Sequence, residues 1–231
     1  MTESPARRAV VIGSSAGIGA AIARKLLEDG WSVVGVDRVS AIIDHPSFAS
    51  RQVDLTDSLA TVNFTRDLPD VQALVHAAGF IQTAPLGALD NAAGRAMWQI
   101  NAGAATLLAN HVVPNMIRQR NGRIILISSR AALGIAGRGQ YAAAKAALVG
   151  LARSWAAEVV ASGITVNVIS PAATRTAMLD DPTRVTSTPQ LPPMGRYIEP
   201  SEIAALASFL LSPQAAAITG QEILICGGAS L

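Results

Sequence analysis

The chain has 231 residues, of which 50% are hydrophobic and only 15% are charged, and its formal net charge is +2. A typical soluble domain has about 25% charged residues, so this composition excludes a disordered chain and predicts that another subunit covers some apolar surface. Two net charges make no basic field, so nucleic acid is not an expected partner. The single Cys226 excludes an internal disulfide and a cysteine metal cluster, and it favours a reducing, cytoplasmic location.

No apolar run reaches the roughly 18 residues of a membrane-spanning helix, and the short run after Arg8 is too brief for a signal peptide. We therefore expect no membrane partner. His45, His76 and His111 are scattered without the spacing of metal ligands, so no metal site is expected.

Short β-branched runs alternate with longer alanine-rich stretches along the whole chain. The predicted strands are residues 9–12, 32–36, 52–53, 73–76, 123–127, 165–169 and 222–225. The predicted helices are residues 18–29, 59–66, 97–119, 141–161 and 201–211, and Trp31, Trp98 and Trp155 are expected to pack in or beside these elements. Several strands are apolar throughout, which is typical of parallel strands covered on both faces. The alternation predicts one α/β domain over residues 1–231, a doubly wound parallel sheet with helices on both faces.

One irregular, proline-rich stretch near residues 178–200 interrupts this alternation. A loop of this length in a compact domain is more often a functional lid than a spacer, so we expect it to cover the substrate. Met178, Leu179, Leu191 and Met194 make it partly apolar.

The first predicted strand runs into a glycine-rich turn, residues 13–19 (GSSAGIG), and a helix follows at once. The glycines allow a tight turn, and the free N–H groups at the helix N-terminus attract phosphates. Asp37 ends the next strand, where a carboxylate can accept hydrogen bonds from an adenosine ribose. An ordinary glycine turn beside a surface aspartate is the alternative, but the order of strand, glycines, helix and acid favours dinucleotide binding.

Asp37 also bears on the choice of cofactor. Its charge repels a 2′-phosphate, which favours NAD over NADP, while the adjacent Arg38 acts in the opposite direction. We therefore expect NAD as the cofactor, with NADP disfavoured.

Tyr141 and Lys145 share one face of a predicted helix. A phenol with a pKa near 10 is a poor base at neutral pH, but a neighbouring ammonium group favours the phenolate and allows proton transfer. Ser128 and Ser129 follow the strand at 123–127, and side chains at this end of a parallel strand face the ligand crevice. Arg138 and Gln140 precede Tyr141 and could approach the mouth of the site, but we expect both to have a surface role.

Together these motifs resemble the short-chain dehydrogenase/reductase family, and the resemblance covers essentially the whole chain. Residues 13–19 match its cofactor turn, and Asp54 with Leu55 resembles the pair that flanks the adenine ring. His76 and Ala77 replace the two asparagines of the family's Asn-Asn-Ala-Gly segment, and His76 either contacts the cofactor or packs at its strand end. Residues 171–176 are similar to the segment around the nicotinamide, with Ala172 for glycine, and Cys226 replaces a usual aspartate.

The resemblance implies a Rossmann fold and a catalytic set of Asn101, Ser129, Tyr141 and Lys145. Tyr141 would exchange the proton of the substrate hydroxyl or carbonyl, and Ser129 would hydrogen-bond the same oxygen. Lys145 would lower the tyrosine pKa and bind the nicotinamide ribose. Asn101 would hold a water. Turn chemistry and resemblance together place the cofactor against Gly13, Ser15, Ala16, Gly17, Ile18, Gly19, Asp37, Arg38, Asp54, Leu55, Ala77, Ala78, Gly79, Tyr141, Lys145, Pro171, Thr174 and Thr176.

The expected function is that of an NAD(P)-dependent oxidoreductase, with NAD preferred, acting on a small or medium alcohol or ketone. A cyclic alcohol, a dihydrodiol and a polyol are all compatible substrates. The alternative is a non-catalytic NAD-binding redox sensor or scaffold, although a pure binder does not need all four catalytic residues. The alanine-rich helix at 141–161 permits close approach of a second subunit, and the resemblance implies a homo-oligomer, a dimer or tetramer.

Overall fold

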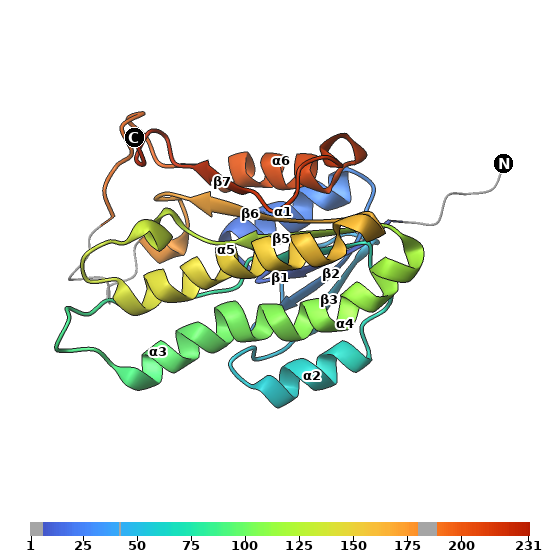
Figure 1. The fold of residues 1–231 in the computed structure, drawn as a ribbon, viewed down its shortest axis with the longest axis horizontal. Helices are drawn as coiled ribbons and strands as arrows, with labels where there is room; N and C mark the ends of the chain where they lie inside the picture. Colours follow the sequence, from blue (N-terminus) through green and yellow to red (C-terminus); the bar gives the residue numbers. More distant parts are fainter. Residues whose placement is uncertain (1–6, 42, 180–188) are drawn as a thin grey trace.

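A computed structural model describes residues 7–41, 43–179 and 189–231 of the chain. Its centre is a seven-stranded sheet in the order β3-β2-β1-β4-β5-β6-β7 (Figure 1). Every neighbouring pair is parallel. The strands are β1 Arg8–Ile12, β2 Ser32–Asp37, β3 Phe48–Gln52, β4 Ala73–His76, β5 Gly122–Ile127, β6 Ile164–Pro171 and β7 Glu222–Ile225. The predicted doubly wound parallel sheet is confirmed.

Helices cover both faces of the sheet (Figure 1). The helices α1 Gly17–Glu28 and α6 Pro200–Leu211 pack side by side on one face. The other face carries α2 Ser58–Arg66, α3 Asn91–Trp98, α4 Ala104–Gln119 and α5 Gly139–Val159. Within the described ranges, no helix is long and apolar enough to cross a membrane.

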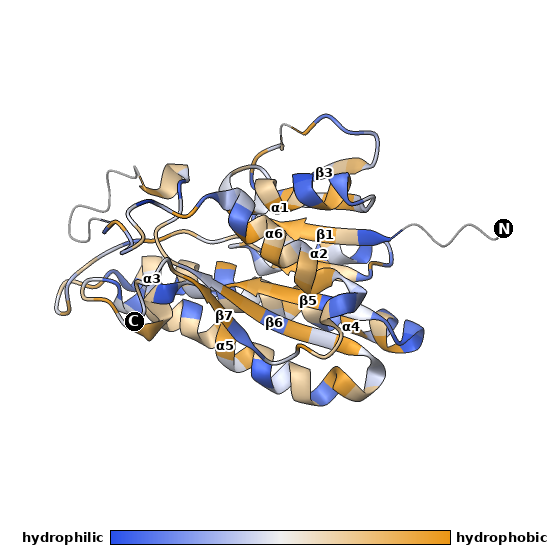
Figure 2. Ribbon diagram, turned by 90° about the horizontal axis from the view of Figure 1, so that it is seen from above, coloured by the Kyte–Doolittle hydropathy of each residue, from blue (hydrophilic) through white to orange (hydrophobic). Residues whose placement is uncertain are grey.

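The apolar strands belong to two separate cores, because successive side chains of a strand point to opposite faces. In β1, Val10 and Ile12 pack with the residues of α4 and α5, whereas Ala9 and Val11 pack with those of α1 and α6. Figure 2 shows the hydrophobic strands enclosed between the helices, whose outer faces carry the hydrophilic residues. This burial on both faces of the sheet accounts for part of the low charge content, so a covering subunit is not needed to explain all of the apolar residues.

The predicted bounds of two elements need correction. The third strand spans Phe48–Gln52 rather than residues 52–53. It is an edge strand, so its residues are mostly half-exposed and lack the apolar signature. The helix predicted from residue 97 begins at Asn91, where the Asp90 side chain accepts the N–H groups of Ala92 and Ala93 as an N-cap.

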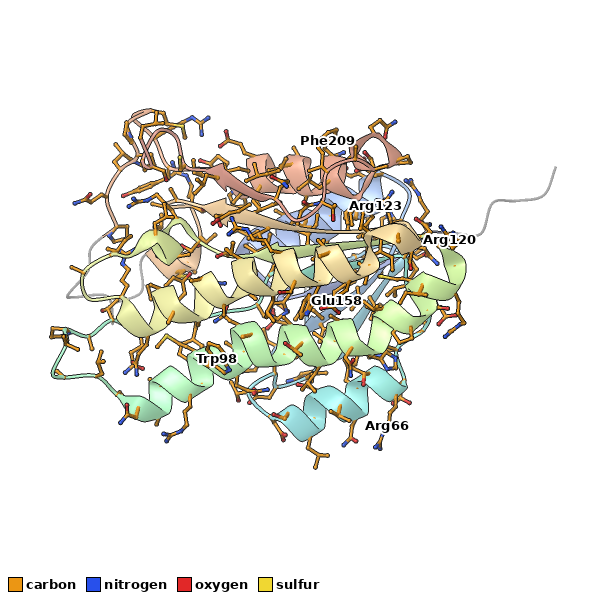
Figure 3. The ribbon with its side chains drawn as sticks, viewed as in Figure 1. Arg66, Trp98, Arg120, Arg123, Glu158 and Phe209 are labelled. Atoms are coloured by element: carbon orange, nitrogen blue, oxygen red, sulfur yellow. The ribbon has the colours of Figure 1, made fainter. Side chains whose placement is uncertain are left out.

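Trp98 is 53% exposed rather than packed, and Figure 3 shows it at the junction of α3 and α4. Trp31 is buried and Trp155 packs against the core, as predicted.

The strand order reverses between β1 and β4, which lie side by side although β2 and β3 intervene in the sequence. At such a switch point the loops leaving the two strands diverge and open a crevice at their carboxyl ends, which lie at the left of Figure 1. Gly13 follows β1 and Ala77 follows β4, so both predicted cofactor segments border this crevice.

Candidate active site

The glycine-rich turn has no room for side chains at two of its glycines. Gly13 has a φ of +84°, and a Cβ there would lie 2.7 Å from the backbone nitrogen of Ala78. A Cβ on Gly19 would overlap the carbonyl oxygen of Gly13. The turn therefore holds β1, α1 and the segment after β4 in close backbone contact, and α1 begins at Gly17 with its N-terminus toward the crevice. Such a cradle fits the pyrophosphate of a dinucleotide.

Asp37 closes the other side of the cradle. One carboxylate oxygen accepts the N–H of Ser15 at 3.0 Å, and the other accepts the N–H of Arg38 at 2.6 Å. These bonds fix the carboxylate at the cavity wall. Asp54 lies on the same wall, where hydrogen bonds from the Thr56 hydroxyl and N–H lower its pKa and keep it ionised.

Tyr141 and Lys145 lie one turn apart near the start of α5, and both are buried, with 7% and 4% exposure. The Lys145 Nζ donates a hydrogen bond to the carbonyl of Ile127 at 2.8 Å and lies 5.8 Å from the centroid of the Tyr141 ring. Burial lowers the pKa of Lys145 to about 7. The lysine is thus held beside the phenol, with its Nζ fixed by the Ile127 carbonyl.

The two serines after β5 have different surroundings. The Ser128 hydroxyl donates to the carbonyl of Lys145 at 2.8 Å and so ties β5 to α5. The Ser129 Oγ accepts the N–H of Ala131 at 3.1 Å, which leaves its own proton available to a ligand in the cavity. Ser129 is therefore the serine that can bind a substrate oxygen.

Asn101 lies behind the cavity wall and is fully buried. Its Nδ2 donates to the carbonyl of Met97 at 2.8 Å, and its Oδ1 has no partner among the described protein atoms. A Cβ on Gly79 would lie 3.0 Å from this Oδ1 and 3.2 Å from the Lys145 Nζ, so both polar atoms converge on Gly79. A buried acceptor beside a lysine fits the expected water-holding role.

These residues surround one cavity of about 1240 Å³. All the predicted catalytic and cofactor residues line it except Ser15 and Asn101. Sequence reasoning missed other wall residues, among them Phe80, Ile81, Arg130, Ile135 and the C-terminal Leu231. Arg130 follows Ser129 directly and donates to the carbonyl of Ala229 at 2.9 Å, which brings the C-terminal turn to the wall. The only sequence signal that could have identified Arg130 is its position directly after Ser129.

Arg138 is half-buried and lines the cavity, contrary to the expectation of a surface position. Gln140 instead donates to the carbonyl of Asp90 and holds α3 against α5. In the part of the chain that the structure describes, no three His, Cys, Asp or Glu side chains are grouped as metal ligands would be.

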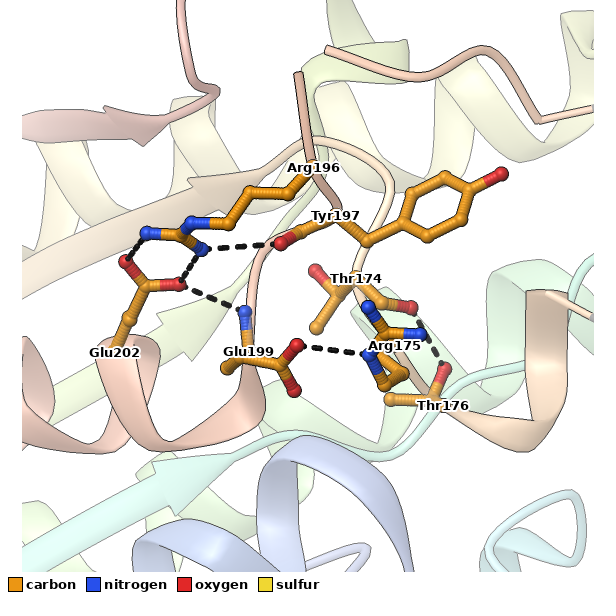
Figure 4. Close-up of polar contacts among 7 residues, drawn as sticks. All are labelled: Thr174, Arg175, Thr176, Arg196, Tyr197, Glu199 and Glu202. Carbon is orange, nitrogen blue, oxygen red and sulfur yellow. Dashed lines mark hydrogen bonds and ion pairs between the residues drawn. The ribbon is translucent and has the colours of Figure 1, made fainter. Parts of the chain in front are cut away.

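The predicted lid leaves the sheet after β6 and returns at α6, and its residues 180–188 lie outside the described ranges. Its two roots are tied together (Figure 4). The Arg175 N–H donates to the Ile198 carbonyl at 2.8 Å, and the Arg175 guanidinium pairs with Glu199 at 2.8 Å. Within the second root, Arg196 pairs with Glu202 through two bonds of 2.7 and 2.9 Å. These contacts fix Thr174 and Thr176 at the cavity.

Comparison with known proteins agrees with this geometry. Residues 12–230 match the family model described as enoyl-(acyl carrier protein) reductase. The chain is 35% identical over 234 residues to the 3-oxoacyl-[acyl-carrier-protein] reductase FabG of Vibrio cholerae, covering 95% of this chain and 96% of the relative.

Solved structures show the same similarity. A protein described as a short chain dehydrogenase/reductase family protein superimposes with a TM-score of 0.89 at 33% identity, over 97% of this chain and 98% of the other. A 4-hydroxyisoleucine dehydrogenase complexed with NADH superimposes with a TM-score of 0.87 at 25% identity, with the same coverage. The chain therefore belongs to the short-chain dehydrogenase/reductase family of oxidoreductases, as the order of its motifs predicted.

Proposed function

We propose that this protein is an NAD-dependent oxidoreductase that interconverts a small or medium ketone and its secondary alcohol. The observation that carries the proposal is the position of Tyr141, Lys145 and Ser129 on one cavity that also contains the glycine cradle. A dinucleotide-binding module without catalysis has no use for a buried lysine beside a buried phenol, because burying an ammonium group costs free energy.

In this proposal, Tyr141 donates a proton to the carbonyl oxygen during reduction and removes it during oxidation. Ser129 donates a hydrogen bond to the same oxygen and holds it in place, and Lys145 favours the tyrosinate that remains. When bound, the cofactor supplies or accepts the hydride. The apolar walls formed by Phe80, Ile81 and Ile135 favour a substrate with some hydrophobic area.

The experiment is a screen of ketones and alcohols, including 3-oxoacyl thioesters, followed through the absorbance of the reduced cofactor. These thioesters are included because a relative is named 3-oxoacyl-[acyl-carrier-protein] reductase. We expect turnover with a subset of ketones that share a substituent. Tight NAD binding without turnover across the panel would instead support the redox sensor or scaffold.

The proposed preference for NAD over NADP can be tested at Asp37. The fixed carboxylate at the ribose end of the cradle should repel a 2′-phosphate, so NAD should bind more tightly than NADP. The 4-hydroxyisoleucine dehydrogenase named above is described as complexed with NADH, which supports this choice. We expect Asp37→Ser to lower the ratio of the dissociation constant for NADP to that for NAD by about tenfold. Isothermal titration with both nucleotides measures it.

Asp44→Ser is the matched control, because it removes the same charge from an exposed position outside the cavity. Its ratio should equal that of the unsubstituted protein. Tighter binding of NADP than NAD by the unsubstituted protein would overturn the preference.

We further propose that the chain forms homo-oligomers through the face that carries Trp98 (Figure 3). A groove of about 460 Å³ runs along this face between α4 and α5, lined mainly by Trp98, Ala102, Gly103, Leu107, Ala147 and Leu151. Light scattering should give a dimer or tetramer mass. Trp98→Glu should lower that mass, whereas Leu86→Glu, at a loop leucine that is 93% exposed, should not. A monomeric mass for the unsubstituted protein would contradict the proposal.

A further inference from the structure

The helix that carries Asn101 is interrupted at that residue. Between α3 and α4, residues Gln99–Gly103 form a π-helical segment. In an α-helix the N–H of Ala104 would donate to the carbonyl of Ile100, four residues earlier. Here it donates to the carbonyl of Gln99 instead. The carbonyl of Ile100, a half-buried residue, thus loses its regular helical donor and can accept a hydrogen bond from elsewhere.

His76 supplies that donor from a different element. It is the last residue of β4, it is fully buried, and its Nε2 lies 2.9 Å from the Ile100 carbonyl oxygen. A carbonyl can only accept, so Nε2 carries the proton. The Nδ1 has no protein partner among the described residues. Burial, with a smaller effect of the nearby Lys145 charge, lowers the pKa of His76 to about 3, so the ring is neutral at working pH.

The hydrogen bond acts directly beside the catalytic set. Asn101 follows Ile100 in the π-helical segment, and its side chain is aimed by its own bond to the Met97 carbonyl. On the strand side, Gly79 follows His76 by three residues and lies against both Asn101 and Lys145. The imidazole therefore fixes the distance between the end of β4 and the segment that presents Asn101 Oδ1 to Lys145.

We propose that His76 is a positioning residue for Asn101. Its Nε2–H donates to the Ile100 carbonyl in place of the Ala104 N–H, which would donate there in a regular α-helix. The proposal rests on the function proposed above, in which Asn101 serves catalysis. His76 does not line the cavity, so it acts through the segment and not on the substrate or the cofactor.

Two substitutions separate this role from simple packing. His76→Gln keeps an N–H donor near the position of Nε2, whereas His76→Leu fills a similar volume without a donor. We expect His76→Leu to lower kcat about tenfold or more, because small displacements of catalytic groups are costly. The dissociation constant for NAD and the substrate KM should change by less than about twofold, and His76→Gln should restore most of kcat. Circular dichroism and thermal unfolding verify the fold of each variant.

A kcat of His76→Leu equal to that of the unsubstituted protein would overturn the proposal. Equal impairment of both variants would also overturn it, because the donor would then be irrelevant.

A second measurement does not depend on turnover. Nitrogen-15 NMR of the unsubstituted protein should show His76 protonated at Nε2 only, unchanged between about pH 5 and pH 9. The Asn101 side-chain amide should shift in His76→Leu and not in His76→Gln. A proton on Nδ1 would contradict the proposal. If no variant or unsubstituted protein turns over any ketone, the proposed function fails, while the NMR result still decides the positioning.

Discussion

Tyr141→Phe is expected to abolish turnover while leaving NAD binding within about twofold of the unsubstituted protein. The substitution removes only the hydroxyl, and the ring stays in its buried position against Lys145. Loss of a general acid or base typically lowers the rate by about 10² to 10⁴. Steady-state rates with a responsive ketone, together with fluorescence titration of NAD, measure both quantities.

Tyr197→Phe is the matched control, because Tyr197 is the other tyrosine of the chain and lies outside the cavity wall. It should leave kcat unchanged. Near-normal rates in Tyr141→Phe would show that another group transfers the proton, and the assignment of Tyr141 would then be wrong.

The second large effect is expected at the cofactor turn, from Gly19→Ala. The new methyl group would overlap the Gly13 carbonyl oxygen, so the turn must open to admit it. We expect the dissociation constant for NAD to rise about tenfold or more and the free energy of unfolding to fall by about 1–3 kcal/mol. Calorimetric titration and urea unfolding measure the two changes.

Gly150→Ala is the control for the same chemical change. Gly150 lies inside α5, and a Cβ there would meet no atom within 4 Å. Because alanine is the better helix former, the control should raise the free energy of unfolding by about 0.5–1 kcal/mol. Unchanged NAD affinity in Gly19→Ala would refute the close backbone contact as the basis of the cradle.

The apolar parallel strands could be predicted because their residues are buried on both faces and therefore carry an unbroken hydrophobic signature. β3 could not be placed in this way, since an edge strand such as Phe48–Gln52 is half-exposed and polar. Asp90 is a local signal for the start of α3, but the low hydrophobicity of the α3 residues kept this helix from being predicted.

The predicted catalytic and cofactor residues other than Ser15 and Asn101 line one cavity, because their motifs follow the carboxyl ends of parallel strands. The role proposed for His76 could not be foreseen, because it depends on a break in helical hydrogen bonding at Ile100, 24 residues away. Leu231 reaches the cavity through the fold of the C-terminal turn, which Arg130 holds by its bond to the Ala229 carbonyl.

Transfer of deuterium from labelled reduced NAD to the carbonyl carbon of a ketone tests the central claim most directly. Mass spectrometry of the product reads it. We predict an alcohol with one deuterium on the former carbonyl carbon from the unsubstituted protein, and no labelled product from Tyr141→Phe. Saturating cofactor binding with no labelled alcohol from any ketone of the panel would contradict the account.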